Sequence, residues 1–202
     1  TLDRSSAASD VYKRQQYTVS AILHSGGVLY VSDQANVYHW NGSNMAAMGA
    51  LASVVDLAAD AAGKVVALSE FHGLNTWDGN AWIPLGIFDG WAGSMTIDSH
   101  GAMYVAGTFE HVNGIPAKKI ARLDGVSWQA LGSGIGGEWP MVTDLHVSEK
   151  GELYVGGLFR LAGGKPSNNI AVWLIDGDAD GHPDRDDVCL LYTSPSPRDR
   201  TR

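Results

Sequence analysis

The chain has 202 residues with a formal net charge of −8, and 45% of its residues are hydrophobic. This negative charge repels the phosphates of nucleic acids and of anionic lipids, which argues against both as partners. No uninterrupted apolar run reaches the ~18 residues of a membrane-spanning helix, so no membrane insertion is expected. The length is sufficient for one domain with a substantial core.

The two ends differ in character from the sequence between them. Residues 1–15 and 190–202 resemble translated sequencing adaptor, and both are predicted to be non-native or disordered flanks. Six basic and three acidic residues lie in these flanks, so the body of the chain is more acidic than the whole. Neither flank enters the fold prediction.

Residues 16–175 show one pattern four times, in which a glycine turn leads into an alternating apolar strand. The strand cores lie at 27–31, 63–67, 101–105 and 151–155. The apolar segments that follow them end in His39-Trp40, Thr76-Trp77, Arg122-Leu123 and Val172-Trp173. Equivalent residues recur at roughly the 40–50 residues that a four-stranded propeller blade needs. The repeat therefore predicts an all-β, β-propeller-type fold of about four antiparallel units.

Further strands complete each unit. Residues 142–147 alternate and predict a first strand, whereas 44–49, 81–86 and 127–132 predict fourth strands. Third and fourth strands are joined through Asn41-Gly42, Asp78-Gly79 or Asp124-Gly125, which are tight-hairpin signals because both positions tolerate positive φ. The alanine-rich stretch 45–62 is the one helical candidate, but its glycine and β-branched residues favour strands.

Two loops and one glycine pair stand out in the later units. Segments 109–118 and 159–168 are long, polar and in corresponding positions, so we expect both to emerge on one face and to make variable contacts. Gly156-Gly157 lies in a predicted second strand, where glycine permits close backbone approach.

The third and fourth units carry the most specific pattern. Tyr104-Val105-Ala106-Gly107-Thr108-Phe109 and Tyr154-Val155-Gly156-Gly157-Leu158-Phe159 are each followed by a glycine-containing turn and an apolar strand. They resemble blades of bacterial surface β-propellers, similar to kelch-like and galactose-oxidase-central-domain-like repeats. The resemblance implies an extracellular or cell-surface recognition or scaffold module without enzymatic activity, whose partner is a carbohydrate or protein. Four units are the lower limit of closure, so we expect an incomplete ring.

An acidic loop follows the repeats at 176–189. Oxygen side chains and one backbone carbonyl fall at the ligand positions of an EF-hand-type loop, and Gly181 allows the sharp turn. The expected ligands are Asp176, Asp178, Asp180, the carbonyl of His182, Asp184 and Asp187. The string resembles a thrombospondin type 3 repeat, which implies calcium as cofactor. The alternative is a solvated acidic linker.

No residue pattern indicates catalysis. The histidines form no metal-binding string, and the serines have no nucleophile-elbow sequence. In-register tryptophans are expected in the core between units, namely Trp40, Trp77, Trp82, Trp128 and Trp173. Trp91 and Trp139 fall in linking segments and are the candidates for ligand stacking, against the alternative that they cap a junction. A secreted polysaccharide-active hydrolase or lyase is the alternative function; it would require acids, or an acid and a histidine, to converge in one pocket.

Overall fold

The computed structural model describes residues 18–60, 62–174 and the backbone of 188–189. Within these ranges every regular element is a β-strand, as predicted. None of the described segments is a helix long and apolar enough to cross a membrane. The two predicted flanks, and the acidic loop except its last two residues, lie outside the described residues.

Four sheets of four strands form the body of the molecule. Blade 1 consists of β1 (Ala21–Ser25), β2 (Val28–Ser32), β3 (Asn36–Trp40) and β4 (Met45–Ala50). Blade 2 consists of β5 (Val54–Ala59), β6 (Val65–Ser69), β7 (Gly73–Trp77) and β8 (Trp82–Gly86). Blade 3 consists of β9 (Ala92–Ile97), β10 (Met103–Gly107), β13 (Ile120–Leu123) and β14 (Trp128–Ala130). Blade 4 consists of β16 (Met141–Val147), β17 (Glu152–Leu158), β20 (Ile170–Leu174) and β21 (Val188–Cys189).

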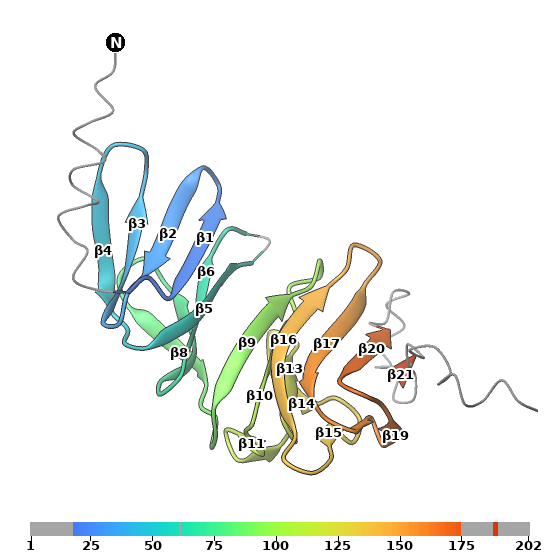
Figure 1. Ribbon diagram of the computed structural model, residues 1–202. Coiled ribbons are helices and arrows are strands. Elements are labelled where there is room, and N and C mark those ends of the chain that lie inside the picture. The colour runs from blue at the N-terminus through green and yellow to red at the C-terminus, as the bar shows by residue number, and fades with distance from the viewer. Residues whose placement is uncertain (1–17, 61, 175–187, 190–202) are drawn as a thin grey trace, which may run out of the picture.

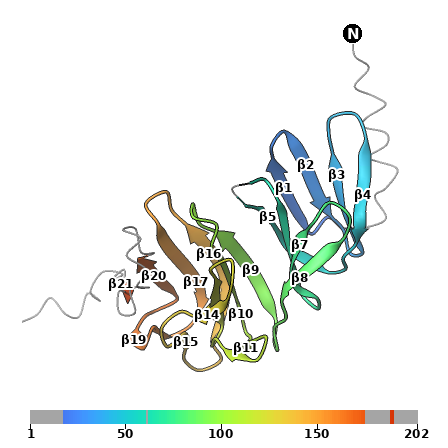
Figure 2. The same ribbon diagram turned by 180° about the vertical axis from the view of Figure 1, so that it is seen from behind.

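Each blade is an antiparallel meander, which confirms the predicted four-stranded unit. The blades follow one another side by side, and blades 1 and 4 stand at opposite ends of an open arc (Figures 1 and 2). The first strands of the blades, β1, β5, β9 and β16, contact one another in series. The ring is not closed, as the number of repeats predicted.

The core lies between blades rather than within them, in three apolar clusters that follow the three blade junctions. Trp128 and Trp173 are buried, each with 6% of its surface exposed. Trp77 and Trp82 pack against the cluster between blades 1 and 2, and the centroids of their rings lie 5.3 Å apart. These four tryptophans confirm the predicted packing between units. Trp40 is half-buried and belongs to none of the three clusters.

The first and second strands of blades 3 and 4 share a β-bulge at the same place. Opposite it, a Cβ on Gly157 would lie 2.2 Å from the carbonyl oxygen of Met141, and one on Gly107 would lie 2.0 Å from that of Trp91. A Cβ on Gly156 would meet nothing within 4 Å. The predicted close backbone approach is therefore correct for Gly157 and wrong for Gly156, because successive strand residues face opposite sides.

The turns between third and fourth strands differ in backbone conformation from the prediction. In each, the Asx residue (Asn41, Asp78 or Asp124) accepts hydrogen bonds through Oδ1 from the backbone N–H groups two and three residues on. Only the following glycine has positive φ. The Asx side chain replaces a second left-handed residue, because it satisfies the turn's donors directly.

Candidate functional site

The two long loops of blades 3 and 4 contain short hairpins that the sequence reasoning missed. In blade 3, β11 (His111–Val112) pairs with β12 (Ile115–Pro116); in blade 4, β18 (Leu161–Ala162) pairs with β19 (Lys165–Pro166). Asn113-Gly114 and Gly163-Gly164 form the turns, with positive φ at both positions of each. Asn-Gly between apolar residues is a hairpin signal that could have located the first of them.

Both hairpins emerge at the same end of the molecule, as predicted, where β11, β15 and β19 are seen in Figure 1. The segments that link successive blades, 87–91 and 133–140, run along the same end. Phe88 forms a bridge with Val112, and β15 (Ile135–Gly136) pairs with β18. We call this end, made of the two hairpins and the two linking segments, the loop face.

The base of each hairpin is anchored in the core. Phe109 and Phe159 are 0% and 2% exposed. In blade 3 the ammonium of Lys119 forms an ion pair with Glu110, and only 11% of the Lys119 side chain is exposed. In blade 4 uncharged groups close the base of the hairpin. Oδ1 of Asn169 accepts a 3.2 Å hydrogen bond from the N–H of Phe159. The hairpins are therefore held rigidly although they carry few strand residues.

An acid and a histidine meet on the loop face. Nδ1 of His111 lies 2.7 Å from Oδ2 of Asp89, and both side chains are almost half exposed. Oδ1 of Asp89 accepts 2.8 Å hydrogen bonds from the N–H groups of Glu110 and His111. Desolvation raises the pKa of Asp89, but the hydrogen bonds from His111 and Glu110 outweigh it and hold that pKa below its usual value.

A shallow hollow of about 440 Å³ adjoins this pair. Its lining consists of Ile87, Phe88, Asp89, His111, Asn113 and Gly114. Asn113 joins the hairpin to the linking segment, because its Oδ1 accepts from the N–H of Ile87 while its own N–H donates to the Ile87 carbonyl, both at 2.9 Å. The lining is mostly apolar, and its polar groups are the Asn113 amide, the His111 imidazole and the Asp89 carboxylate, with no hydroxyl or thiol. This composition suits binding.

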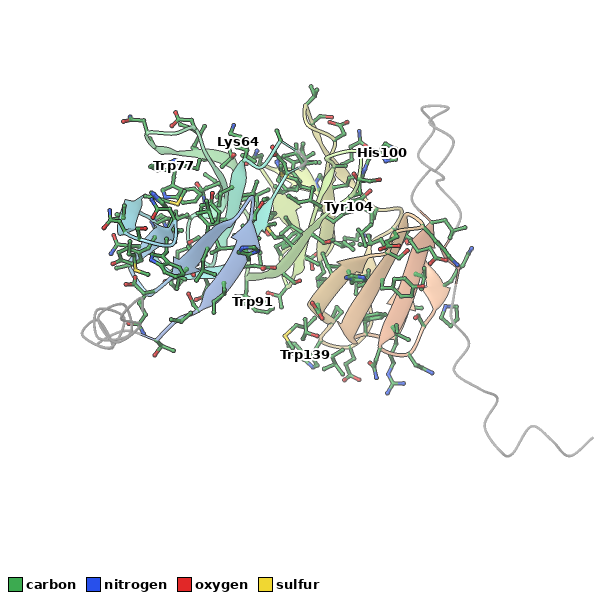
Figure 3. All side chains as sticks on the ribbon, turned by 90° about the horizontal axis from the view of Figure 1, so that it is seen from above. Lys64, Trp77, Trp91, His100, Tyr104 and Trp139 are labelled. Atoms are coloured by element: carbon green, nitrogen blue, oxygen red, sulfur yellow. The ribbon has the colours of Figure 1, made fainter. Side chains whose placement is uncertain are left out.

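The two tryptophans singled out as ligand-binding candidates lie in different surroundings (Figure 3). Trp91 is half-buried, and its ring packs so closely on Gly93 that a Cβ there would lie 2.0 Å from a ring atom. Trp139 is 85% exposed and has a φ of +59°. The structure thus places Trp91 at a junction and leaves the Trp139 ring accessible. No contact joins the two.

Exposed apolar side chains gather at this end of the blades. Eleven large hydrophobic residues are exposed among the described residues, and six of them lie at the end of the blades where the two hairpins emerge. They are Phe71, Ile87, Ile115, Trp139, Leu158 and Leu161. Clusters of exposed apolar residues on a soluble domain mark interaction surfaces. The opposite end presents Val126, in a hairpin turn, 93% exposed.

A polar group enclosed between blades 3 and 4 is structural. Tyr104, labelled in Figure 3, is 2% exposed; its hydroxyl donates to Oδ2 of Asp98 at 3.1 Å and accepts from Nε of Arg122 at 3.1 Å. Burial and the Asp98 charge raise the pKa of Tyr104 to about 12. The phenol therefore stays protonated and acts as a hydrogen-bonding link within the blade.

Metal ligands do not cluster in the part of the chain that the structure describes. No three His, Cys, Asp or Glu side chains lie together there. The predicted calcium ligands, Asp176, Asp178, Asp180, His182, Asp184 and Asp187, all lie outside the described residues. The calcium site therefore stays a prediction.

No protein-family model matches the chain, and no curated protein matches it. The computationally designed Ika4 protein is 14% identical over 80% of this chain and 93% of that chain, with a TM-score of 0.56. The designed Ika8 protein is 13% identical over 81% of this chain and 48% of that chain, also with a TM-score of 0.56. A gluconolactonase from Xanthomonas campestris is 18% identical over 73% of this chain and 54% of that chain, with a TM-score of 0.49. Together with the four-stranded blades, the likeness to the two designed proteins supports a propeller-type fold and extends no further.

Proposed function

We propose that the chain is a recognition module of a secreted or surface-attached bacterial protein, without enzymatic activity, and that the loop face is its binding surface. The observation that carries this proposal is the gathering of exposed apolar side chains on rigidly anchored hairpins and linking segments. Preorganised loops lose little conformational entropy on binding, so such a surface suits ligand capture. That the blades are related to kelch-like repeats is part of the same proposal.

The partner proposed is a carbohydrate or a protein of the cell surface. The accessible Trp139 ring offers an apolar platform of the kind on which sugar rings and peptide side chains stack. Elsewhere on the loop face, the hollow lined by Ile87, Asn113 and His111 supplies an amide and an imidazole for polar contacts.

The test is a binding screen of the full chain against soluble oligosaccharides and against surface-protein peptides. For any ligand found, Trp139→Ala should weaken binding about tenfold or more, as for an aromatic hot spot. Val126→Ala is the matched control, since Val126 is equally accessible but lies at the opposite end. Equal affinities for Trp139→Ala and the wild type would contradict the assignment of the surface.

We further propose that the acidic loop, which lies between β20 and β21 in the sequence, is a calcium-binding spacer. Support comes from its five carboxylates at EF-hand ligand positions. Calorimetric titration of the full chain should give a Kd of ~10⁻⁴–10⁻³ M, as for extracellular modules. The double variant Asp178→Asn/Asp180→Asn should lose the heat, whereas Asp186→Asn, off the ligand pattern, should retain it. Absence of heat at millimolar calcium would remove the proposal.

One observation favours the enzyme alternative. Asp89 and His111 come from different segments and meet at 2.7 Å, and a carboxylate in that position can orient an imidazole for proton transfer. A reducing-end assay on soluble polysaccharides would reveal cleavage, and His111→Ala should abolish it. Cleavage that survives His111→Ala would exclude this pair as the catalytic group.

A further inference from the structure

The first strands of the four blades place one apolar residue in the same position. Ile22, Leu57, Met95 and Leu145 pair respectively with Val31, Ala67, Val105 and Val155, each at the same distance from the glycine turn. Leu57, Met95 and Leu145 are each 6% exposed, because the preceding blade covers them. Ile22 is 64% exposed. Of these four positions, only Ile22 of blade 1 is not covered by a preceding blade in the described part of the chain.

A side-chain acceptor on blade 2 and another on blade 3 reach the same position of the next blade. Oδ2 of Asp56 accepts a 3.0 Å hydrogen bond from the N–H of Met95, and Oγ of Ser94 accepts a 3.1 Å bond from the N–H of Leu145. Asp56 and Ser94 occupy equivalent places beside the bulge of their first strands. First strands are sheet edges, so these N–H groups have no backbone acceptor within their own sheet and bond to side-chain oxygens.

Asp144 is the third member of this series. It stands beside the bulge of β16 as Asp56 does beside that of β5. Oδ1 of each carboxylate accepts from the N–H of the next residue, Leu145 or Leu57. Asp144 is exposed, and the structure gives its Oδ2 no hydrogen bond among the described residues. It presents the acceptor that a following blade would use.

We propose that two copies of this chain associate head to tail, with blade 4 of one copy docked on blade 1 of the other. The carboxylate of Asp144 then accepts the N–H of Ile22, and the Ile22 side chain becomes buried as Met95 is. The interface continues the junction already repeated between blades 2 and 3 and between blades 3 and 4. A second copy fits because both halves of that junction belong to this one chain.

The rest of the two faces agrees with this pairing. On blade 1, Leu29 and Val31 are half-buried, whereas the equivalent Val65 and Ala67 of blade 2 are 4% and 0% exposed. On blade 4, Gly156 opens onto free space, whereas the equivalent Ala106 of blade 3 is 0% exposed against blade 4. At these positions the open face of each end blade resembles the covered face of an internal blade. Glu152 of blade 4 differs, because it replaces the buried Ala102 of blade 3.

Sedimentation velocity of the full chain over about 5–200 µM tests the proposal, since association must follow mass action. The wild type should shift from monomer to a dimer or to larger head-to-tail chains. Asp144→Lys and Ile22→Glu should each weaken association about tenfold or more, because each leaves a donor or an apolar face without its partner. The controls are Glu149→Lys and Val126→Glu, which make comparable changes on exposed turns away from both faces.

A mixture of two variants distinguishes head-to-tail pairing from other modes. For the mixture Ile22→Lys replaces Ile22→Glu, so that the junction between the two substituted faces sets two lysines against each other. Ile22→Lys and Asp144→Lys each keep one intact face, and mixed together they should form a one-to-one dimer and nothing larger. Self-association of Asp144→Lys alone would indicate head-to-head contact and overturn the proposal. A wild type that stays monomeric throughout would overturn it as well. Circular dichroism of each variant verifies that the blades remain folded.

Discussion

The backbone of β16 passes so close to Gly157 that a Cβ there would lie 2.2 Å from the Met141 carbonyl oxygen. Gly157→Ala should therefore lower the free energy of unfolding by about 1–3 kcal/mol, as for an overpacked site that must shift backbone. Gly156→Ala, one residue away on the open side, should change it by less than about 0.5 kcal/mol. Urea unfolding of both variants measures the difference. Equal effects of the two substitutions would show that the backbone of β16 can shift without a cost in stability.

Asp89 makes a pH-dependent contribution to stability. Its pKa is below the usual value in the folded protein, so its stabilising effect is present above the unfolded pKa of about 3.9 and is lost as pH falls through the folded pKa. Asp89→Asn should therefore be less stable than the wild type near neutral pH, and the two should converge in strong acid. Urea midpoints measured from about pH 2.5 to pH 7 test this. A gap of constant size across that range would contradict the assignment.

At the scale of single residues the sequence did not predict where side chains lie in the fold. Trp91 and Trp139 were equivalent candidates, yet only Trp139 is accessible. Trp91 packs on Gly93, a contact between neighbouring residues that depends on the bulge in β9. The Asp89–His111 contact was not predicted, because it joins a linking segment to a hairpin twenty-odd residues away through strand pairing that no local pattern encodes.

At the scale of elements, the fourth-strand tryptophans bind one blade to the preceding one. Nε1 of Trp128 donates a 2.9 Å hydrogen bond to the Leu85 carbonyl, whereas Nε1 of Trp82 is buried and has no partner among the described residues. Trp128→Phe should cost about 1–3 kcal/mol, because the Leu85 carbonyl then keeps only the longer 3.5 Å hydrogen bond from Nδ2 of Asn113. Trp82→Phe should cost less, since it removes an unpaired donor. Thermal unfolding of the two variants measures the difference. A larger loss of stability for Trp82→Phe than for Trp128→Phe would contradict this account.

Element prediction succeeded where a short apolar segment follows a glycine turn. β6 was found as a continuous apolar run and β17 as an alternating one, each directly after a turn glycine. The hairpins β11–β12 and β18–β19 were missed because two-residue strands show no periodicity. Their stability comes from Phe109, Phe159 and the neighbouring linking segments, which are tertiary contacts.

At the scale of the whole molecule, protection is expected to be uneven along the arc. Every residue of β6 is buried between blades 1 and 3, whereas exposed and half-buried residues alternate in β1. Hydrogen exchange of the monomer at low micromolar concentration should therefore be slowest in β6 and fastest in β1. β1 amides that exchange as slowly as those of β6 would show that blade 1 is stabilised by contacts other than those to blade 2.

The sequence by itself determined the repeat, the four-stranded blade and the stacking of blades, because period-two alternation and turn glycines are local consequences of backbone geometry. Only the tertiary structure decided which tryptophan is accessible, where Asp89 and His111 meet, and that Ile22 of blade 1 and Asp144 of blade 4 are exposed. These features depend on contacts between residues far apart in the chain. A repeat pattern describes every junction alike and cannot tell which junction lacks a partner.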